Sequence, residues 1–201
     1  VSTSSVKKDE ELIEQVQRLM DGKPAFIAIQ SPLKVPKTGY RRAQEHINML
    51  FGQYGIAVDK VSRSSLKKRF GRVRGEGIVA LLNDIGISHE PRITAFERSR
   101  KCFEVFVPAS AVAIFELDQA LVYNAKVPLK KRREELVRFQ GLLKKIGDVR
   151  LSKALLSRKL DGLDNAALSS YASQLEAVLC ACLAYDAWRN PKSFAILGNL
   201  R

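Results

Sequence analysis

The feature that most constrains the fold is a short, uninterrupted apolar run, AFIAI, at residues 25–29. Turn-forming residues precede it, and a loop with prolines, a glycine and several basic residues follows it at residues 30–41. Such a run between turn signals is typical of a strand that is buried on both faces, as in a parallel sheet. Because ligands of open α/β sheets bind at the carboxyl ends of the strands, this loop is the first place to look for a site.

Apolar residues at helical spacing predict several helices around this strand. The predicted helices span residues 9–20, 40–53, 75–85, 111–122, 150–158 and 166–188, and one more is opened by the basic cluster at 126–138 and runs to about residue 145. A second strand is predicted at 101–107, where side chains alternate before Pro108, and 61–65 is an alternative strand. Two strands do not make a stable sheet, so we expect either undetected strands or a sheet that is incomplete in this chain.

Length and composition fit one substantial domain. The chain has 201 residues, of which 46% are hydrophobic and 27% charged, which is ordinary for a globular protein. We expect a residual N-terminus at 1–8, an α/β domain at 9–190 and a tail at 191–201. The three cysteines form no ligand spacing with the two histidines, which predicts buried thiols in a reducing compartment and no zinc site. No apolar run of membrane-helix length and no signal peptide is apparent, so we expect a cytoplasmic protein without a membrane partner.

The charge of the chain points to a polyanionic partner. Lys and Arg number 34 against 21 Asp and Glu, which gives a formal net charge of +13. A surface of this kind attracts nucleic acid. The alternatives are a basic surface that meets an acidic partner, or one that reflects a generally basic proteome.

The order of four short motifs resembles a known family. A-I-Q-S-P-L ends the first strand at residues 28–33, R-G-E-G-I opens a helix at 74–78, and F-E-V-F-V-P-A-S and L-E-A-V-L-C-A-C-L-A follow at 103–110 and 175–184. Together they resemble the domain of unknown function 429 family, predicted RNase H-like nucleases, over roughly residues 10–190. The resemblance implies an α/β fold in which an RNase H-like mixed sheet is flanked by helices. Only eight residues precede the first predicted helix, so we expect the first strands of that sheet to be lacking.

The family resemblance also implies a metal-dependent phosphodiesterase. An RNase H-like site gathers acidic side chains from the first strand, the fourth strand and a late helix around two divalent cations that activate water. Carried onto this chain, the strand glutamate is Glu104, the late-helix acid is Glu176, and the amide of Gln30 stands where the family has an aspartate. These three are the candidate catalytic residues, with Glu104 and Glu176 as ligands of Mg²⁺ or Mn²⁺. The competing interpretations are a salt bridge for Glu104 and ordinary strand-end hydrogen bonding for Gln30.

Basic residues outside these motifs are candidates for phosphate contact, since arginine pairs with phosphate in a bidentate way. A solvated surface that never meets nucleic acid is the equal alternative. Three aromatic residues, Tyr40, Phe70 and Tyr123, are candidates for base stacking, although we expect them to pack into the core. The candidate nucleic-acid-binding set is Arg69, Arg72, Arg74, Lys126, Lys130 and Lys131.

Three functions follow as hypotheses. The first is a metal-dependent nuclease, impaired by Gln30 and by the missing strands. The second is a non-catalytic nucleic-acid-binding module with the same fold. The third is an interaction protein, for instance a homodimer that pairs through an exposed sheet edge.

Overall fold

A computed structural model describes residues 3–147 and 149–198 of the chain. Its described part contains a three-stranded sheet in the order β1 (Ala25–Ile29), β3 (Arg100–Glu104) and β2 (Ser88–His89). Both strand pairs are parallel. The prediction of a parallel AFIAI strand is therefore confirmed. Its predicted burial on both faces is wrong, since all five residues are half-buried, and the mixed sheet is wrong for the described residues.

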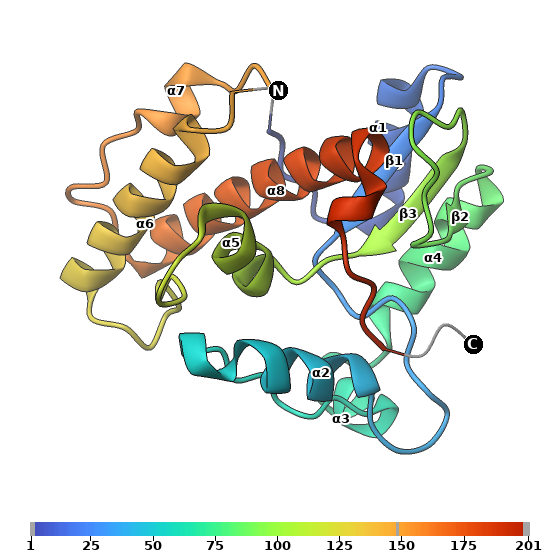
Figure 1. The fold of residues 1–201 in the computed structure, drawn as a ribbon, viewed down its shortest axis with the longest axis horizontal. Coiled ribbons are helices and arrows are strands. Elements are labelled where there is room, and N and C mark those ends of the chain that lie inside the picture. The colour runs from blue at the N-terminus through green and yellow to red at the C-terminus, as the bar shows by residue number, and fades with distance from the viewer. Residues whose placement is uncertain (1–2, 148, 199–201) are drawn as a thin grey trace.

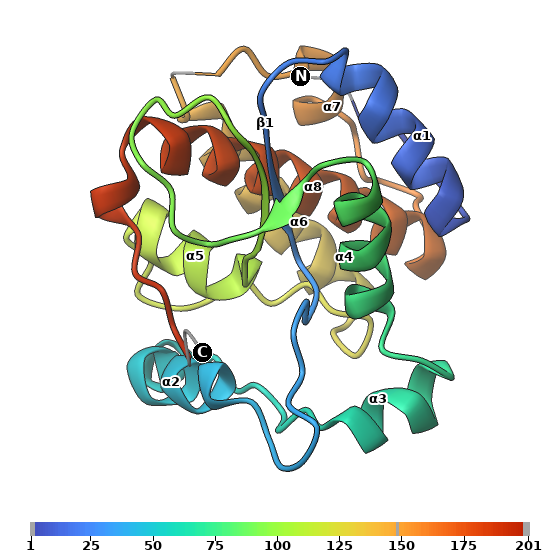
Figure 2. The same cartoon turned by 90° about the vertical axis from the view of Figure 1, so that its right-hand side faces the viewer.

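Helices cover both faces of the sheet. On one side lie α1 (Asp9–Met20) and α4 (Arg74–Asp84), and on the other lies the long α8 (Asn165–Arg189). Figures 1 and 2 show β1 between these two layers. The chain is an α/β protein with a small parallel sheet at its centre.

The alternation of side chains along β1 supplies both halves of the core. Ile27 and Ile29 pack into the cluster formed with α1 and α4. Phe26 and Ala28 pack on the opposite face, against the cluster that contains Ala184 of α8. All five residues of β1 are only half-buried, because β1 is the edge of the described sheet.

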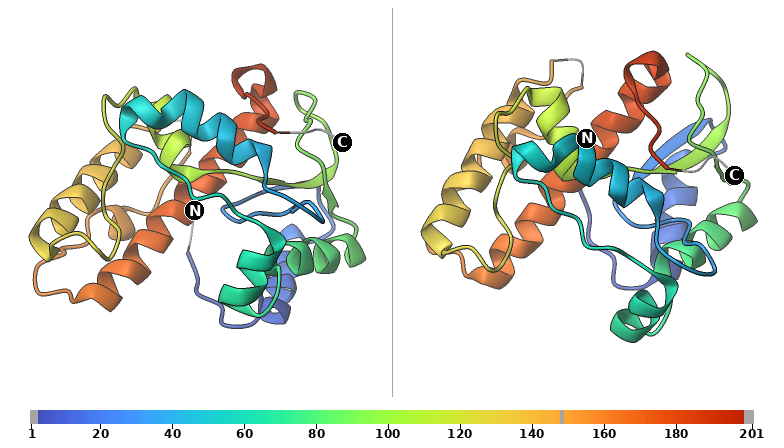
Figure 3. Two further views of the ribbon diagram at one scale, coloured as in Figure 1. Left: turned by 90° about the horizontal axis from the view of Figure 1, so that it is seen from below. Right: turned by 60° about the horizontal axis from the view of Figure 1, so that its bottom comes forward.

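The remaining helices form two further groups. The first half of α8 packs against α6 (Leu129–Lys144), which contacts the short α7 (Lys153–Leu156), and against α5 (Val107–Phe115). The second group, α2 (Arg42–Phe51), η1 (Gly52–Tyr54) and α3 (Arg63–Phe70), lies beyond the carboxyl ends of the strands (Figures 1 and 3). A last short turn, η2 (Pro191–Ser193), follows α8.

Local capping explains several helix starts. The side chain of Ser62 accepts a hydrogen bond from the backbone N–H of Ser65, and the side chain of Ser65 accepts one from the backbone N–H of Ser62. This reciprocal cap starts α3, and for this reason the alternative strand at 61–65 is wrong. At α8, the carboxylate of Asp164 accepts the N–H of Ala167 at 2.7 Å, which is a standard N-terminal cap.

Three predicted elements end elsewhere than expected. The strand predicted to reach residue 107 stops at Glu104, because Pro108 stands in the first turn of α5, where its missing N–H costs nothing. The helix predicted over 111–122 ends at Phe115, followed by Glu116 in the left-handed region at φ 49°. The helix predicted at 150–158 is reduced to α7. The two-residue β2 is too short to produce a detectable alternation.

The length and composition of helix α8 resemble those of a membrane span. Contrary to the expectation from the sequence, this helix is long and apolar enough by length and composition to cross a membrane, the one such helix in the described residues. Half of the qualifying stretch is buried within the protein, as in a core helix. All three cysteines, two of them in α8, are buried and unpaired, as predicted.

Candidate functional site

The candidate site lies at the carboxyl edge of the sheet. Glu104 is the last residue of β3 and pairs in register with Ile29, so Gln30 immediately follows the end of the neighbouring strand. His89 ends β2 at the same edge, since all three strands are parallel. The structure therefore brings the ends of three strands together where α/β proteins bind ligands.

Glu104 is engaged by a cation of the same chain. Its Oε2 receives the guanidinium of Arg41 and the backbone N–H of Leu33, the latter at 3.0 Å. The Nε of Arg41 also donates to the carbonyl of Lys34 at 2.9 Å. The side chains of Arg41 and Glu104 are 11% and 27% exposed. The salt-bridge interpretation of Glu104 thus describes its present state.

Glu176 has a different set of partners. It lies on the sheet-facing side of α8 and accepts the hydroxyl proton of Tyr123 at 2.8 Å. Burial raises the pKa of Glu176 above its ordinary value, while hydrogen bonds from Tyr123 and Gln30 act in the opposite direction. Burial and the Glu176 charge also raise the pKa of Tyr123. Burial of Glu176 therefore acts against its charged form, and the two hydrogen bonds act to support that form.

Gln30 is brought to Glu176, while Glu104 at the end of the adjacent strand β3 is paired with Arg41 of the loop after β1. In the described part of the chain, no three His, Cys, Asp or Glu side chains lie together in a way that could hold a metal ion. Mg²⁺ takes oxygen ligands and is usually held in proteins by one or two carboxylates together with waters, and a pair of such ions needs more carboxylates than a single one. One amide, one ion-paired carboxylate and one carboxyl with a raised pKa do not fit a pair of such ions as folded.

Two residues of this edge escaped detection in the sequence. The pairing of Arg41 could not be predicted from the sequence, because its partner Glu104 lies 63 residues further along the chain. His89 lies near Glu104 and two cations; burial lowers its pKa, the charge of Glu104 acts to raise it, and Lys34 and Arg41 act to lower it. Neither residue stands in a local sequence pattern that indicates these neighbours.

Side chains of α3 and α4 hold the loop at 30–41 in place. Arg63 donates to both carboxylate oxygens of Glu76, at 2.8 and 2.6 Å, and to the carbonyl of Val35 at 3.0 Å. Glu76 in turn accepts the N–H of Val35 at 3.1 Å. A Cβ on Gly75 would lie 2.0 Å from the carbonyl oxygen of Pro32. Glycine is required here by the close approach of the loop to α4.

The basic candidates divide into three groups. Arg72 and Arg74 both pair with Asp9, which is only 6% exposed, at 2.7 Å; they tie the start of α4 to the first residue of α1. Arg69 lies over the ring of Phe70. The exposed lysines Lys126, Lys130 and Lys131 stand at the start of α6.

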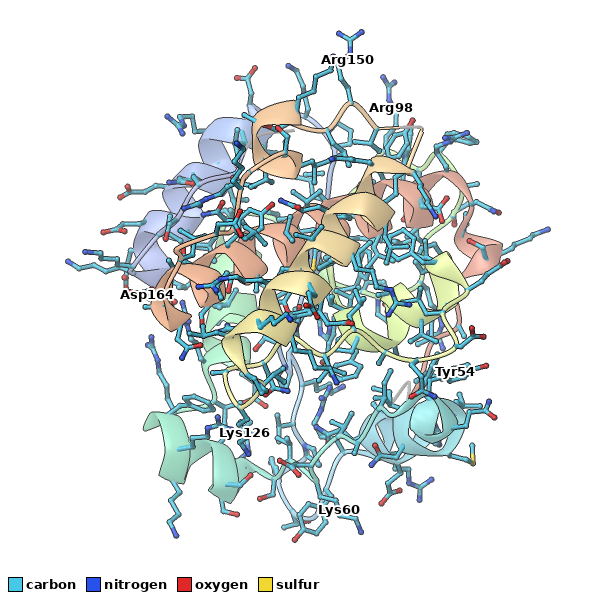
Figure 4. All side chains as sticks on the ribbon, turned by 90° about the vertical axis from the view of Figure 1, so that its left-hand side faces the viewer. Tyr54, Lys60, Arg98, Lys126, Arg150 and Asp164 are labelled. Atoms are coloured by element: carbon cyan, nitrogen blue, oxygen red, sulfur yellow. The ribbon has the colours of Figure 1, made fainter. Side chains whose placement is uncertain are left out.

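These groups do not form one surface. The start of α6 and helix α3 lie apart in Figures 1 and 3. The labelled residues Lys60 and Lys126 lie on the opposite side of the molecule from Arg98 and Arg150 (Figure 4). Among the aromatic candidates, Tyr123 stacks on Phe139 inside the core. Tyr40 and Phe70 are 55% and 56% exposed, so the prediction of core packing is wrong for both.

Comparison with known proteins gives one match. The sequence model of a family described as protein of unknown function (DUF429) matches residues 3–194. No curated protein matches the chain significantly. No solved structure does so either.

Proposed function

We propose that this chain, which belongs to the DUF429 family of proteins of unknown function, is an RNase H-like domain that binds nucleic acid without cleaving it by two-metal catalysis. The observation that carries the proposal is the ion pair between Arg41 and Glu104. In this account β1 and β3 are two of the parallel strands of an RNase H-like sheet. Gln30 and Glu104 then stand at the strand ends where such a site gathers its acidic ligands.

The ion pair argues against a metal at Glu104. A guanidinium that is 11% exposed supplies the positive charge that a cation would otherwise bring. A metal ion would have to displace Arg41 and leave its charge buried without a partner, which is costly. Gln30 adds no charge to compensate, and burial raises the pKa of Glu176. Should Mg²⁺ or Mn²⁺ bind after such a rearrangement, Glu104 and Glu176 would be the residues to hold it and the ion would activate water.

The nucleic-acid part of the proposal rests on charge and exposure. The net charge is +13, and Lys126, Lys130 and Lys131 are exposed without a carboxylate partner among the salt bridges of the described residues. Exposed lysines contact phosphates and carry no sequence information. Binding should therefore be salt-sensitive and weakly selective for sequence.

A salt series with lysine variants tests this proposal. The triple change of Lys126, Lys130 and Lys131 to Gln should weaken binding to labelled single- and double-stranded DNA and RNA. It should also reduce the slope of log K against log salt by about 2 to 3, since each phosphate contact contributes about 0.9 for duplex DNA. A matched triple change of the exposed Lys153, Lys159 and Lys192 to Gln is the control for net charge. Equal losses in both triples would show that the start of α6 is no binding site.

The third hypothesis, an interaction protein, is favoured by a separate observation, the unpaired edge of β1. It does not exclude nucleic-acid binding, because the lysines of α6 and the edge of β1 are different parts of the molecule.

A further inference from the structure

Two exposed aromatic rings near α3 each have a cation over the face of the ring. The Nζ of Lys60 lies 5.6 Å from the ring centre of Tyr40, and the guanidinium of Arg69 lies 5.0 Å from that of Phe70. Both rings are nevertheless more than half exposed. Lys60 lies just before α3 and Phe70 is its last residue, at the same end of the molecule (Figures 2 and 4). We call residues 60–70 together with Tyr40 the α3 surface.

The α3 surface is basic and has no acidic counterpart of its own. Residues 60–70 include no Asp or Glu, and Lys67 and Lys68 are exposed. Among the described residues, no carboxylate forms a salt bridge with these two lysines, with Lys60 or with Arg69. None of the residues of α3 is fully buried, so these cations do not serve to pack the helix. Clustered cations of this kind attract a polyanion.

The backbone that carries the two rings is held by ion pairs. Arg41, the neighbour of Tyr40, pairs with Glu104. Arg63, the first residue of α3, pairs with Glu76 of α4. The rings are therefore presented from fixed positions, and a ligand that stacks on them pays less for ordering the protein.

The combination of rings and cations favours one class of polyanion. A base can stack on a protein ring only where it is unpaired, because the bases of a duplex are already stacked on one another. A membrane surface would require an apolar helix face, whereas Phe70 is the one large apolar side chain of α3 that is exposed. A further strand paired with β1 would lie beside the sheet, whereas α3 lies beyond the carboxyl ends of the strands (Figure 1).

We propose that the α3 surface binds single-stranded nucleic acid, with bases stacked on Tyr40 and Phe70 and phosphates at Lys67 and Lys68. The inference rests on the proposed nucleic-acid binding and adds to it the class of strand and a second site. This site is separate from the lysines at the start of α6.

Ring variants test the stacking. Tyr40→Leu and Phe70→Leu keep an apolar side chain, and each should weaken binding to a labelled single strand of about 12 nucleotides at least about fivefold. Binding to a duplex of the same sequence should change less than about twofold, since a duplex is held through its phosphates. The control is Tyr185→Leu, because Tyr185 of α8 is also exposed and has Arg189 over its ring at 5.5 Å. An equal loss in the control, or an equal loss for the duplex, would overturn the inference.

A salt series tests the phosphate contacts. The double change of Lys67 and Lys68 to Gln should reduce the slope of log K against log salt for single strands by about 1.4, which is about 0.7 for each phosphate. An unchanged slope would contradict the inference. Thermal unfolding of this variant and of both ring variants should match that of the wild type, because all four side chains are exposed.

Photocrosslinking locates the strand on the protein directly. A single strand that carries iodouracil should form adducts in peptides that contain Tyr40 or Phe70, identified by mass spectrometry. If the ring variants bind single strands as the wild type does, while the triple change at the start of α6 weakens binding, the proposed function stands and this inference falls. A wild-type chain that binds no nucleic acid would contradict both. Binding to anionic lipid vesicles that is lost in the ring variants, with single-strand binding intact, would assign the surface to a membrane and overturn the inference.

Discussion

Arg41 holds the carboxylate of Glu104 from across a parallel sheet edge, although 63 residues separate the two in the chain. The backbone N–H of Leu33 shares the same oxygen. The loop that follows β1 is thereby tied to the end of β3. This tie decides how the candidate site is understood, because it places a fixed positive charge where a metal ion was expected.

The first prediction concerns the stability of this ion pair. The change Arg41→Gln should lower the free energy of unfolding by about 2 to 3 kcal/mol, somewhat less than for a fully buried pair because Glu104 is 27% exposed. Urea denaturation measures the loss. The double change with Glu104→Gln should recover part of it, since no carboxylate is then left without its partner. A double variant less stable than Arg41→Gln alone would contradict the account.

A second prediction follows from Glu176. Burial raises its pKa in the folded state above the ordinary 4.5, so the folded chain binds more protons than the unfolded chain just above pH 4.5. Stability from this group is fully present below that pH and falls as the pH rises toward the folded-state pKa. Glu176→Gln keeps an acceptor for Tyr123 and removes the charge. The free energy of unfolding of the variant, measured with urea, should therefore rise relative to that of the wild type as the pH goes from 4 to neutral. A difference between the two free energies that does not change with pH would contradict the raised pKa.

Two glycines in α4 provide a matched pair for the third prediction. Gly75→Ala places a Cβ 2.0 Å from the carbonyl oxygen of Pro32 and should cost about 1 to 3 kcal/mol through overpacking. Gly77→Ala meets nothing within 4 Å and should stabilise the helix by up to about 1 kcal/mol. Thermal unfolding of both variants measures the contrast. Similar effects at the two positions would mean that the loop does not rest on α4.

The cysteines support a fourth prediction. Burial raises the pKa of Cys102 and Cys182 to about 11 and that of Cys180 to about 12. Since the thiolate is the reactive form, the native protein should react slowly with a disulfide reagent near neutral pH. All three thiols should react at once in denaturant. A fast-reacting thiol in the native state would show that one of them is accessible.

Periodicity in the sequence was enough to predict the edge strand β1 and the main helices. AFIAI at 25–29 and the apolar spacing over 9–20 and 166–188 match β1, α1 and α8 closely. The predicted end of the second strand was wrong because of Pro108, since a proline is equally typical of the residue after a strand and of the first turn of a helix. The end of β3 and the start of α5 therefore could not be separated from sequence alone.

The candidate site was predictable only in part. The family resemblance named Gln30, Glu104 and Glu176, and the structure brings Gln30 to Glu176. The partner of Glu104 was not predictable, since any of 34 basic residues was a candidate. The partnership of Arg72 and Arg74 with Asp9 was missed for the same reason: ion pairs between distant segments leave no local pattern.

The central claim is that this chain binds nucleic acid but does not cleave it by two-metal catalysis. The most direct measurement incubates labelled single- and double-stranded DNA and RNA with the wild-type chain and its Glu104→Gln variant, with Mg²⁺ or Mn²⁺ and at several salt concentrations. The account predicts salt-sensitive binding and intact nucleic acid for both proteins. Metal-dependent cleavage by the wild type that disappears in Glu104→Gln would contradict it and establish a nuclease in which the metal displaces Arg41.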